Sequence, residues 1–402
     1  MDSVALAPIG ALLLVACLIA MLSRRLGLPY IVGLVVAGFL VALLPSSPSI
    51  PLSRELIFNI LLPPLVFEAA LQLDWKRFRS ELPLTLTLAF FGVAVAGAVV
   101  AAGMHEFFGW GWTGAALFGI LIAATDPVSV IATFKESGVR GRLRLLVEAE
   151  SLFNDGTAAV AFGIVVAIAL GQRFSAFELT STLVTTAGGG ILCGAAIAGA
   201  VLLLAGPATD HLVELAFTTV AAYGSFLLAD HFRLSGILAT VTAGIMLGNL
   251  GPLGAITDKG REAVEAFWEF AAFVANSLVF LLLGLHLAQQ HFSSAWRPAA
   301  AAIVIVLLGR AVAVYPCCLL FARSALRVES KHQHLLFWGG LRGALALALA
   351  LGLPAELPGR EDIITVSFAV VAASIFIQGL TMPPLLHKLG ELTSRRWDKP
   401  VA

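Results

Sequence analysis

The amino-acid sequence predicts an all-α polytopic membrane protein, on the basis of its composition, its hydropathy and the length of its apolar stretches. Of the 402 residues, 59% are hydrophobic and 12% are charged, and the mean hydropathy is +0.94. A soluble domain carries about 25% charged residues, so the composition excludes a water-soluble enzyme, a nucleic-acid binder and a disordered scaffold. The 25 basic and 25 acidic residues cancel, so no net charge points to an anionic partner.

Thirteen apolar stretches are candidate transmembrane helices. A spanning helix needs about 20 mostly apolar residues, because lipid offers no hydrogen-bond partner to the backbone. The stretches cover approximately residues 4–22, 30–45, 56–73, 82–103, 108–134, 145–171, 179–206, 211–229, 234–250, 263–288, 297–321, 331–352 and 362–387. The loops between them are too short to fold as independent soluble domains.

The basic residues predict a multi-pass protein of the cell membrane with its N-terminus outside and its C-terminus in the cytoplasm. In this orientation eighteen Lys and Arg residues are cytoplasmic and five are outside, which agrees with the positive-inside rule. The first stretch is expected to be a retained helix rather than a secretory signal, because Arg24 and Arg25 follow it and no basic residue precedes it. The four cysteines lie in apolar stretches without CxxC spacing, so we expect no disulfide framework, resident metal or cofactor.

An acid and a proline interrupt the fifth stretch. Thr125 and Asp126 precede Pro127, which has no amide hydrogen and disfavours helix in the residue before it. Unwound backbone at membrane depth is tolerated where it lines a polar cavity. The alternative is a simple proline kink in which Asp126 caps the following half-helix.

A polar helical face is predicted in the sixth stretch, which carries the segment ESLFNDG at 150–156. At 3.6 residues per turn, Glu150 lies above Asn154, and Ser151 lies above Asp155. Ionisable groups inside a membrane are costly and usually functional. The alternative is an interhelical hydrogen-bond cluster with a structural role.

The twelfth stretch combines glycines with a buried cation, in the segment WGGLRGA at 338–344. Three glycines within five residues weaken the helix and permit unwinding. The guanidinium of Arg342 needs an acid, and Glu150 is the best candidate because its helix keeps Asp155 as a second, free carboxylate. Arg310, in the eleventh stretch, is expected instead to cap carbonyls or to snorkel.

Glu68 in the third stretch follows two adjacent prolines, in the segment LPPLVFE at 62–68. The prolines and the acid together suggest a distorted helix that faces protein rather than lipid. The alternative is a neutral carboxyl group without a role in transport.

The positions of the interruptions suggest two inverted halves. If residues of about 4–171 and 211–387 form two repeats joined by a linking helix at about 179–206, then the interrupted fifth and twelfth stretches occupy corresponding places. Six helices and one linking helix turn the second half upside down, which is the inverted-repeat pattern of secondary transporters whose broken helices meet at the ion site. Residues 388–402 are then a short cytoplasmic tail.

These motifs resemble those of the monovalent cation:proton antiporters, most closely the electroneutral sodium/proton exchanger branch of prokaryotes and the eukaryotic sodium/hydrogen exchangers. The resemblance rests on the Leu62-Pro63-Pro64 segment with Glu68, on 125–127, on 150–156 and on 340–343, and it extends over nearly the whole chain. It implies thirteen helices, a mobile six-helix core and a separate dimerisation domain, hence a homodimer.

The same resemblance implies the roles of individual residues. Asp155 binds cation or proton in turn, Ser151 and the Thr125 backbone contribute oxygens, and Glu150 pairs with Arg342. In electrogenic relatives an Asp stands where this chain has Asn154.

Sodium and protons are therefore the expected substrates, exchanged across the lipid bilayer. Sodium prefers several oxygen ligands, and we expect them from Asp155, Ser151, a freed carbonyl near Thr125 and Glu68, with Asp126 beside them. One carboxylate cannot hold a proton and a sodium ion together, so occupancy is exclusive, and Asn154 in place of a second acid predicts a one-for-one exchange.

Competing interpretations lie within and outside the transporter class. Potassium/proton exchange on the same fold is the nearest alternative. An intramembrane aspartyl protease using Asp126 and Asp155 is remote, because its Gly-x-Gly-Asp signature is absent. A passive channel lacks a visible filter segment.

Overall fold

The computed structural model describes residues 6–26, 28–45, 52–126, 130–131, 134, 138–205, 210–251, 256–290, 292 and 295–391. Pro127, the first five residues and the expected cytoplasmic tail after Glu391 lie outside the described residues, and so do the predictions that concern them.

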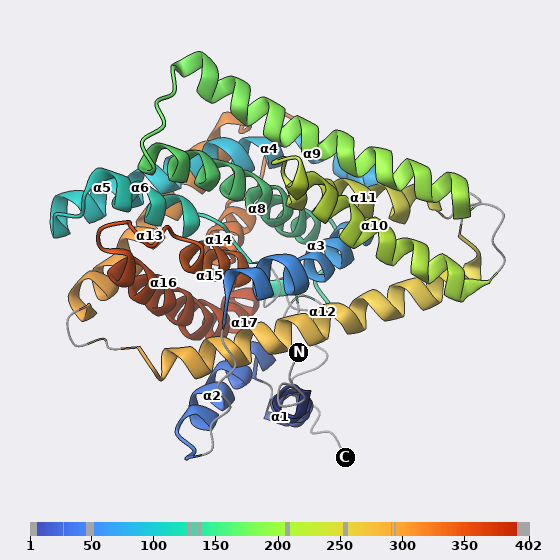
Figure 1. The fold of residues 1–402 in the computed structure, drawn as a ribbon, viewed down its shortest axis with the longest axis horizontal. Coiled ribbons are helices and arrows are strands. Elements are labelled where there is room, and N and C mark those ends of the chain that lie inside the picture. Colours follow the sequence, from blue (N-terminus) through green and yellow to red (C-terminus); the bar gives the residue numbers. More distant parts are fainter. Residues whose placement is uncertain are drawn as a thin grey trace.

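The described residues form helices joined by turns and contain no strand, which confirms the all-α prediction. The helical elements (Figure 1) are α1 (Leu6–Leu26), α2 (Tyr30–Ala42), η1 (Leu56–Leu61), α3 (Leu62–Leu71), α4 (Trp75–Thr87), η2 (Leu88–Gly92), α5 (Val93–Phe108), α6 (Trp112–Leu121), α8 (Arg142–Ala169), α9 (Ala176–Ala205), α10 (His211–His231), α11 (Gly236–Leu250), α12 (Asp258–Leu287), α13 (Trp296–Leu320), α14 (Ser330–Trp338), α15 (Ala344–Leu351), α16 (Arg360–Ser374), η4 (Ile375–Gly379) and α17 (Leu380–Lys388). Within the described residues, 7 helical segments are long and apolar enough to cross a membrane.

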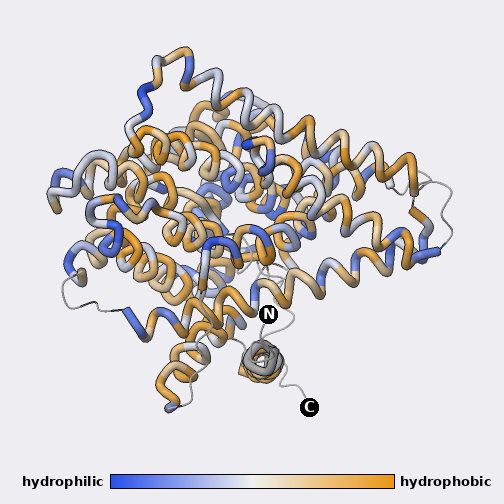
Figure 2. Tube along the Cα trace, viewed as in Figure 1, coloured by the Kyte–Doolittle hydropathy of each residue, from blue (hydrophilic) through white to orange (hydrophobic). Residues whose placement is uncertain are grey.

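Hydropathy follows the helices in the way that a bilayer requires. Figure 2 shows hydrophobic residues along most of the helices, with hydrophilic residues gathered at helix ends and near the middle of the bundle. Several large apolar side chains stay exposed on the outer helix α9, among them Phe177 at 82% and Leu203 at 83%. In water such a surface would be costly, whereas lipid accepts it.

The helices pack as two groups, which we call the core group and the scaffold group. In the core group α4, α5, α6, α8, α13, α14, α15, α16 and α17 contact mainly one another, and in the scaffold group α1, α2, α3, α9, α10, α11 and α12 do the same. Fewer contacts join the two groups, chiefly where α8 meets α9 and α11. The site described below lies between the groups.

Close helix packing in the scaffold group depends on glycine. A Cβ on Gly38 of α2 would collide with the carbonyl of Leu281 on α12, and a Cβ on Gly284 would collide with the carbonyl of Val35. Small residues let helix backbones approach in the absence of a hydrophobic driving force between helices in lipid. These reciprocal glycines therefore hold α2 and α12 together along their length.

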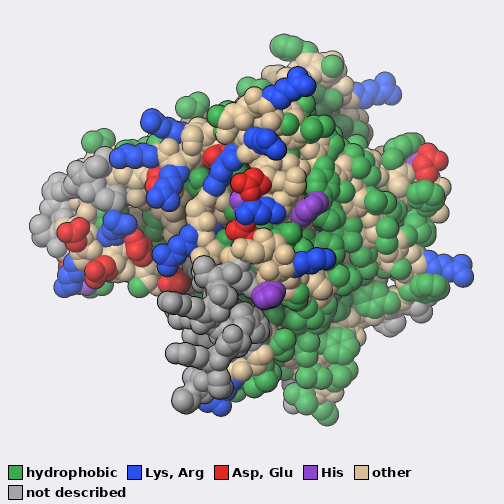
Figure 3. All heavy atoms as spheres, turned by 180° about the vertical axis from the view of Figure 1, so that it is seen from behind, with side chains coloured by type: hydrophobic (Ala, Val, Ile, Leu, Met, Phe, Trp, Pro, Cys, Tyr) green, Lys and Arg blue, Asp and Glu red, His purple; other side chains and the backbone are tan. Residues whose placement is uncertain are grey.

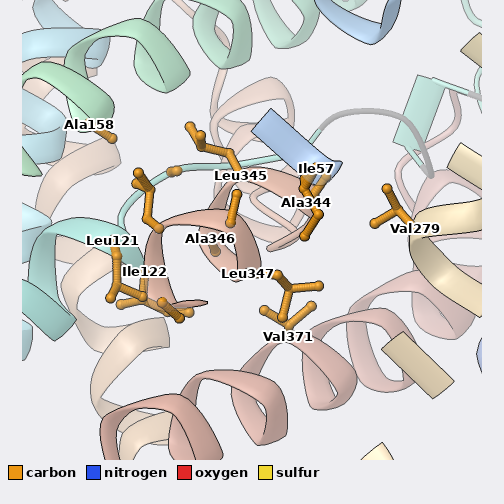
Figure 4. Packing of buried hydrophobic residues seen from close by; sticks show 14 of the residues in the cluster. Ile57, Leu121, Ile122, Ala158, Val279, Ala344, Leu345, Ala346, Leu347 and Val371 are labelled. Carbon is orange, nitrogen blue, oxygen red and sulfur yellow. The ribbon is translucent and has the colours of Figure 1, made fainter. Parts of the chain in front are cut away.

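Two stretches of the core group depart from helical geometry at its centre. Residues 122–126 follow the end of α6 without helical structure, and 339–343 separate α14 from α15. The short helix α15 is almost wholly buried, and Figure 4 shows its residues Ala344 to Leu347 packed among Ile57, Val279, Leu121 and Val371. An interior of this kind holds the non-helical residues in place.

Candidate functional site

A cavity of about 580 Å³ lies between the core group and the scaffold group. Most of its wall is apolar, and its polar wall consists of Ser23, Tyr30, Glu68, Gln72, Thr125, Asp126, Glu148, Asp155, Glu269 and Asn276. Carboxylates from α3, α8, α12 and the non-helical residues after α6 therefore face a common space inside an apolar protein. Oxygen-rich surroundings of this kind suit a hard cation.

The two non-helical segments contact each other directly at this cavity. The backbone N–H of Asp126 donates a hydrogen bond to the carbonyl of Leu341, with 2.8 Å between nitrogen and oxygen. Gly343 lies so close to the Asp126 carboxylate that a Cβ at this position would overlap it. Thus the acid of the first interruption sits against the glycine that precedes α15.

Arg342 satisfies backbone groups that the first interruption leaves without helical partners. Its Nη1 donates to the carbonyls of Ala123 and Ala124, at 2.7 and 3.0 Å. Its own backbone N–H donates to Ser374 Oγ at 3.1 Å. Because unpaired backbone carbonyls are costly in a buried site, this guanidinium supports the non-helical geometry at 122–126.

The prediction that Glu150 pairs with Arg342 is wrong, because the partner of Glu150 is Arg310. Arg310 Nη1 and Nη2 lie 2.7 and 3.1 Å from the two carboxylate oxygens of Glu150, and both side chains are buried. Arg310 Nη2 also donates to the carbonyl of Leu336 at 3.0 Å, so the expected carbonyl contact of Arg310 exists beside the ion pair. The sequence placed both arginines in apolar stretches but did not show which one packs against α8.

Behind the cavity wall, a hydrogen-bond network fixes Thr125. Its hydroxyl lies 3.0 Å from Ser151 Oγ, and Asn154 Nδ2 donates to Thr125 Oγ1 and to Glu150 Oε1, both at 3.2 Å. Ser151 and Asn154 are buried and are not among the residues that line the cavity. The next residue of α8, Asp155, does line it.

The scaffold group contributes Glu68 to the opposite wall. Glu68 lies on α3 and accepts a short hydrogen bond from the side-chain amide of Gln72, one helical turn later. Tyr30 at the start of α2 and Asn276 on α12 line the same cavity.

The structure thus brings four of the residues singled out from the sequence, Glu68, Thr125, Asp126 and Asp155, to one cavity, with Ser151 and Asn154 directly behind it. Sequence reasoning did not assign Tyr30 to this place. Its position at the start of an apolar stretch is also typical of an interfacial anchor, so the sequence alone did not indicate that Tyr30 lines the cavity.

Comparison with known proteins identifies the family. A family model described as "Sodium/hydrogen exchanger, transmembrane" matches residues 11–388. The chain belongs to the sodium/hydrogen exchanger family. Its members are transporters rather than enzymes, which sets the protease interpretation aside and confirms the resemblance found in the motifs.

Named relatives in this family are antiporters. The chain is 39% identical over 370 residues to the Na(+)/H(+) antiporter ApNhaP of Aphanothece halophytica, covering 92% of this chain and 71% of that protein. It is 32% identical over 342 residues to the Na(+)/H(+) antiporter NhaH of Halobacillus aidingensis, covering 83% of each protein. Membership of this family and the apolar helices together make the chain a multi-pass membrane antiporter.

The fold matches that of a solved sodium proton antiporter. The sodium proton antiporter MjNhaP1 from Methanocaldococcus jannaschii at pH 8 superposes with a TM-score of 0.77 and 19% identity, covering 95% of this chain and 97% of that one. At this identity the match concerns the fold alone. Within the described residues, no group of three or more His, Cys, Asp or Glu side chains is arranged to hold a metal ion.

Proposed function

We propose that the chain exchanges sodium or lithium for protons across the cytoplasmic membrane, one for one, with Asp155 binding the cation and the proton in turn. The observation that carries this proposal is the arrangement of two adjacent side chains on α8: Asp155 lines the cavity, whereas Asn154 is turned into the network with Thr125 and Glu150. Relatives named Na(+)/H(+) antiporters support sodium as the cation.

Exclusive occupancy of one carboxylate couples the two ions. A bare carboxylate in an apolar interior is penalised by loss of hydration, whereas the protonated form and the sodium-bound form are each close to neutral. Movement of the empty, charged core group through an occluded state is therefore disfavoured. Since Asn154 carries no charge, each cycle transports a single positive charge in each direction.

The proposed sodium ligands come from both helix groups. Asp155 supplies the charge and Thr125 contributes an oxygen from the core group, held by Ser151 behind it at 3.0 Å. Glu68 contributes from α3 of the scaffold group. Asp126 lies beside them at the contact with Gly343. Driven by ion gradients alone, this exchange would need no cofactor.

Transport would proceed by movement of the core group against the scaffold group, which contact each other less than they contact themselves. The cavity reaches Glu148, which pairs with Arg144 at 2.7 Å near the basic start of α8, an end that we assign to the cytoplasm. At the other end the groups meet where Thr365 Oγ1 donates to Gln290 Oε1 at 3.0 Å. This state would be open to the cytoplasm.

Further parts of the proposal concern topology and assembly. We assign thirteen membrane crossings with the N-terminus outside, two inverted repeats of about 4–171 and 211–387 with a linking helix at about 179–206, and a homodimer. Figure 3 shows the molecule from behind, with many Lys, Arg, Asp and Glu side chains gathered beside a continuous hydrophobic flank. Such a boundary is expected where helices leave the lipid. The interrupted fifth and twelfth stretches would then be the crossing helices of the two repeats.

Reconstituted vesicles that contain a pH-sensitive dye test the proposal. Challenge with sodium should drive proton movement in the wild-type protein and in Asp230→Asn, an exposed control on α10, but not in Asp155→Asn. Undiminished exchange by Asp155→Asn would refute the role of this residue. A response to potassium but not to sodium would make the chain a potassium/proton antiporter, and a sizeable current under a sodium gradient would refute one-for-one exchange.

A further inference from the structure

A second, smaller space lies within the core group, separate from the transport cavity. It has a volume of about 20 Å³ and is bounded by α13, the 339–343 segment, α16 and η4. We call this space the arginine void, because Arg310 and Arg342 both line it, together with Gly340, Ser374 and Gln378. It shares no lining residue with the transport cavity.

Both arginines that line this void have an unused hydrogen-bond donor. Arg310 is 5% exposed and Arg342 is 2% exposed, and the Nε of each has no hydrogen-bond partner among the described residues. A buried donor without a partner costs about 1–3 kcal/mol, and more when the group is charged. Two such groups at one small space indicate an occupant that accepts hydrogen bonds.

The remaining wall fits such an acceptor. The side-chain amide of Gln378 uses one N–H for the carbonyl of Trp338, at 2.9 Å, and an amide nitrogen has a second hydrogen to donate. The absence of a side chain on Gly340 lets the Arg310 guanidinium lie against this backbone, since a Cβ there would stand 2.6 Å from Arg310 Nε. The other lining residues are aliphatic side chains of α13, α16 and η4, so they offer the guanidinium groups no hydrogen-bond acceptor.

The local charge favours an anion over a neutral occupant. Glu150 pairs with Arg310, whereas Arg342 contacts backbone carbonyls and no carboxylate of the described residues. Buried charges are stable when an opposite charge lies nearby. A water molecule is neutral and accepts only two hydrogen bonds, whereas a halide ion accepts from every donor around it and supplies the missing negative charge.

We propose that the arginine void binds one monovalent halide ion, chloride under physiological conditions, between Arg310 and Arg342. By accepting hydrogen bonds from Arg310 and Arg342, the ion would link α13 to the 339–343 segment beside α16. It would in this way stabilise the core group that moves during transport. It is a structural anion, separate from the transported cation, and its binding does not depend on which cation is exchanged.

Thermal unfolding of the purified full chain in detergent provides the first test. Sodium chloride, sodium bromide and sodium gluconate are compared at equal sodium concentration and ionic strength. For the wild-type protein we expect Tm to rise with chloride or bromide and to saturate, by at least about 2 °C over gluconate. Bromide should also give an anomalous scattering peak between the two arginines in crystals.

Two variants that fill the void make the test specific. Ala373→Val on α16 and Val306→Ile on α13 add carbon atoms at positions that line the void. Both variants should abolish the halide response of Tm. The matched control is Ala369→Val, one turn earlier on α16 and outside the void lining, which should keep the halide response. Equal Tm in chloride and gluconate for the wild-type protein would overturn the proposal. So would a halide response that persists in either folded void-filling variant, or a water molecule in place of the bromide peak.

Discussion

The ion pair between Arg310 and Glu150 allows the sharpest test of the core group. Both side chains are buried, at 6% and 2% exposure, and two hydrogen bonds of 2.7 and 3.1 Å join them. Removal of one member of such a pair leaves an uncompensated charge and costs about 3–5 kcal/mol. We therefore expect Arg310→Met to lower the stability of the folded protein by this amount, with a further loss from the contact with Leu336.

A double-mutant cycle separates this pair from the pair that the sequence suggested. Glu150→Gln alone should also be destabilising, since it leaves Arg310 without its anion. The double variant Glu150→Gln/Arg310→Met should be more stable than the sum of the single changes predicts, because neither charge is left alone. The matched cycle of Glu150→Gln with Arg342→Met should show a clearly smaller coupling energy, because no ion pair or hydrogen bond joins these two side chains.

Thermal unfolding in detergent, monitored by tryptophan fluorescence and by retention of a monodisperse peak in size-exclusion chromatography, measures the cycle. Non-additivity for the cycle with Arg342 and additivity for the cycle with Arg310 would refute the pairing. Equal Tm for Arg310→Met and the wild-type protein would refute the argument that a buried charge depends on its partner.

Two further predictions concern two separate places: the contact between Gly343 and Asp126, and the ion pairs of Glu391 near the end of the described residues. Gly343→Ala should abolish vesicle ion exchange while the protein still reaches the membrane, because the new Cβ displaces the Asp126 carboxylate; exchange at the wild-type rate would contradict this. Although partial burial opposes the effect, hydrogen bonds from Lys331 and His332 lower the pKa of Glu391. A lowered carboxyl pKa contributes stability that is present at neutral pH and is lost as pH falls through the folded-state pKa. Acid should therefore lower Tm less in Glu391→Gln than in the wild-type protein. Parallel Tm profiles of the two proteins from neutral pH to pH 4 would contradict this prediction.

Much of the architecture was accessible from the sequence because lipid imposes simple requirements. Backbone groups must be satisfied within each segment, so apolar stretches become helices, and each of the thirteen stretches overlaps described helix. Acids in such stretches are costly and rarely accidental. The same logic pointed to Glu68, Asp126 and Asp155, which line a common cavity.

Hydropathy and local chemistry did not predict which arginine pairs with Glu150. Arg310 and Arg342 have the same chemistry and similar surroundings in the sequence, and Glu150 lies far from both along the chain. Only the packing of α13 against the core decides that Arg310 reaches the carboxylate. Arg342 is held instead by the carbonyls that the non-helical backbone frees.

The sequence by itself therefore determined the helical membrane class, the positions of the interruptions and the acids that face the cavity, because these follow from hydropathy and from the local chemistry of proline and glycine. Tertiary structure alone decided the contact of Asp126 with Gly343, the pairing of Glu150 and the void between the two arginines. All three depend on which helix faces meet in space. The first two join residues more than 150 positions apart and so leave no local pattern from which a single sequence could predict them.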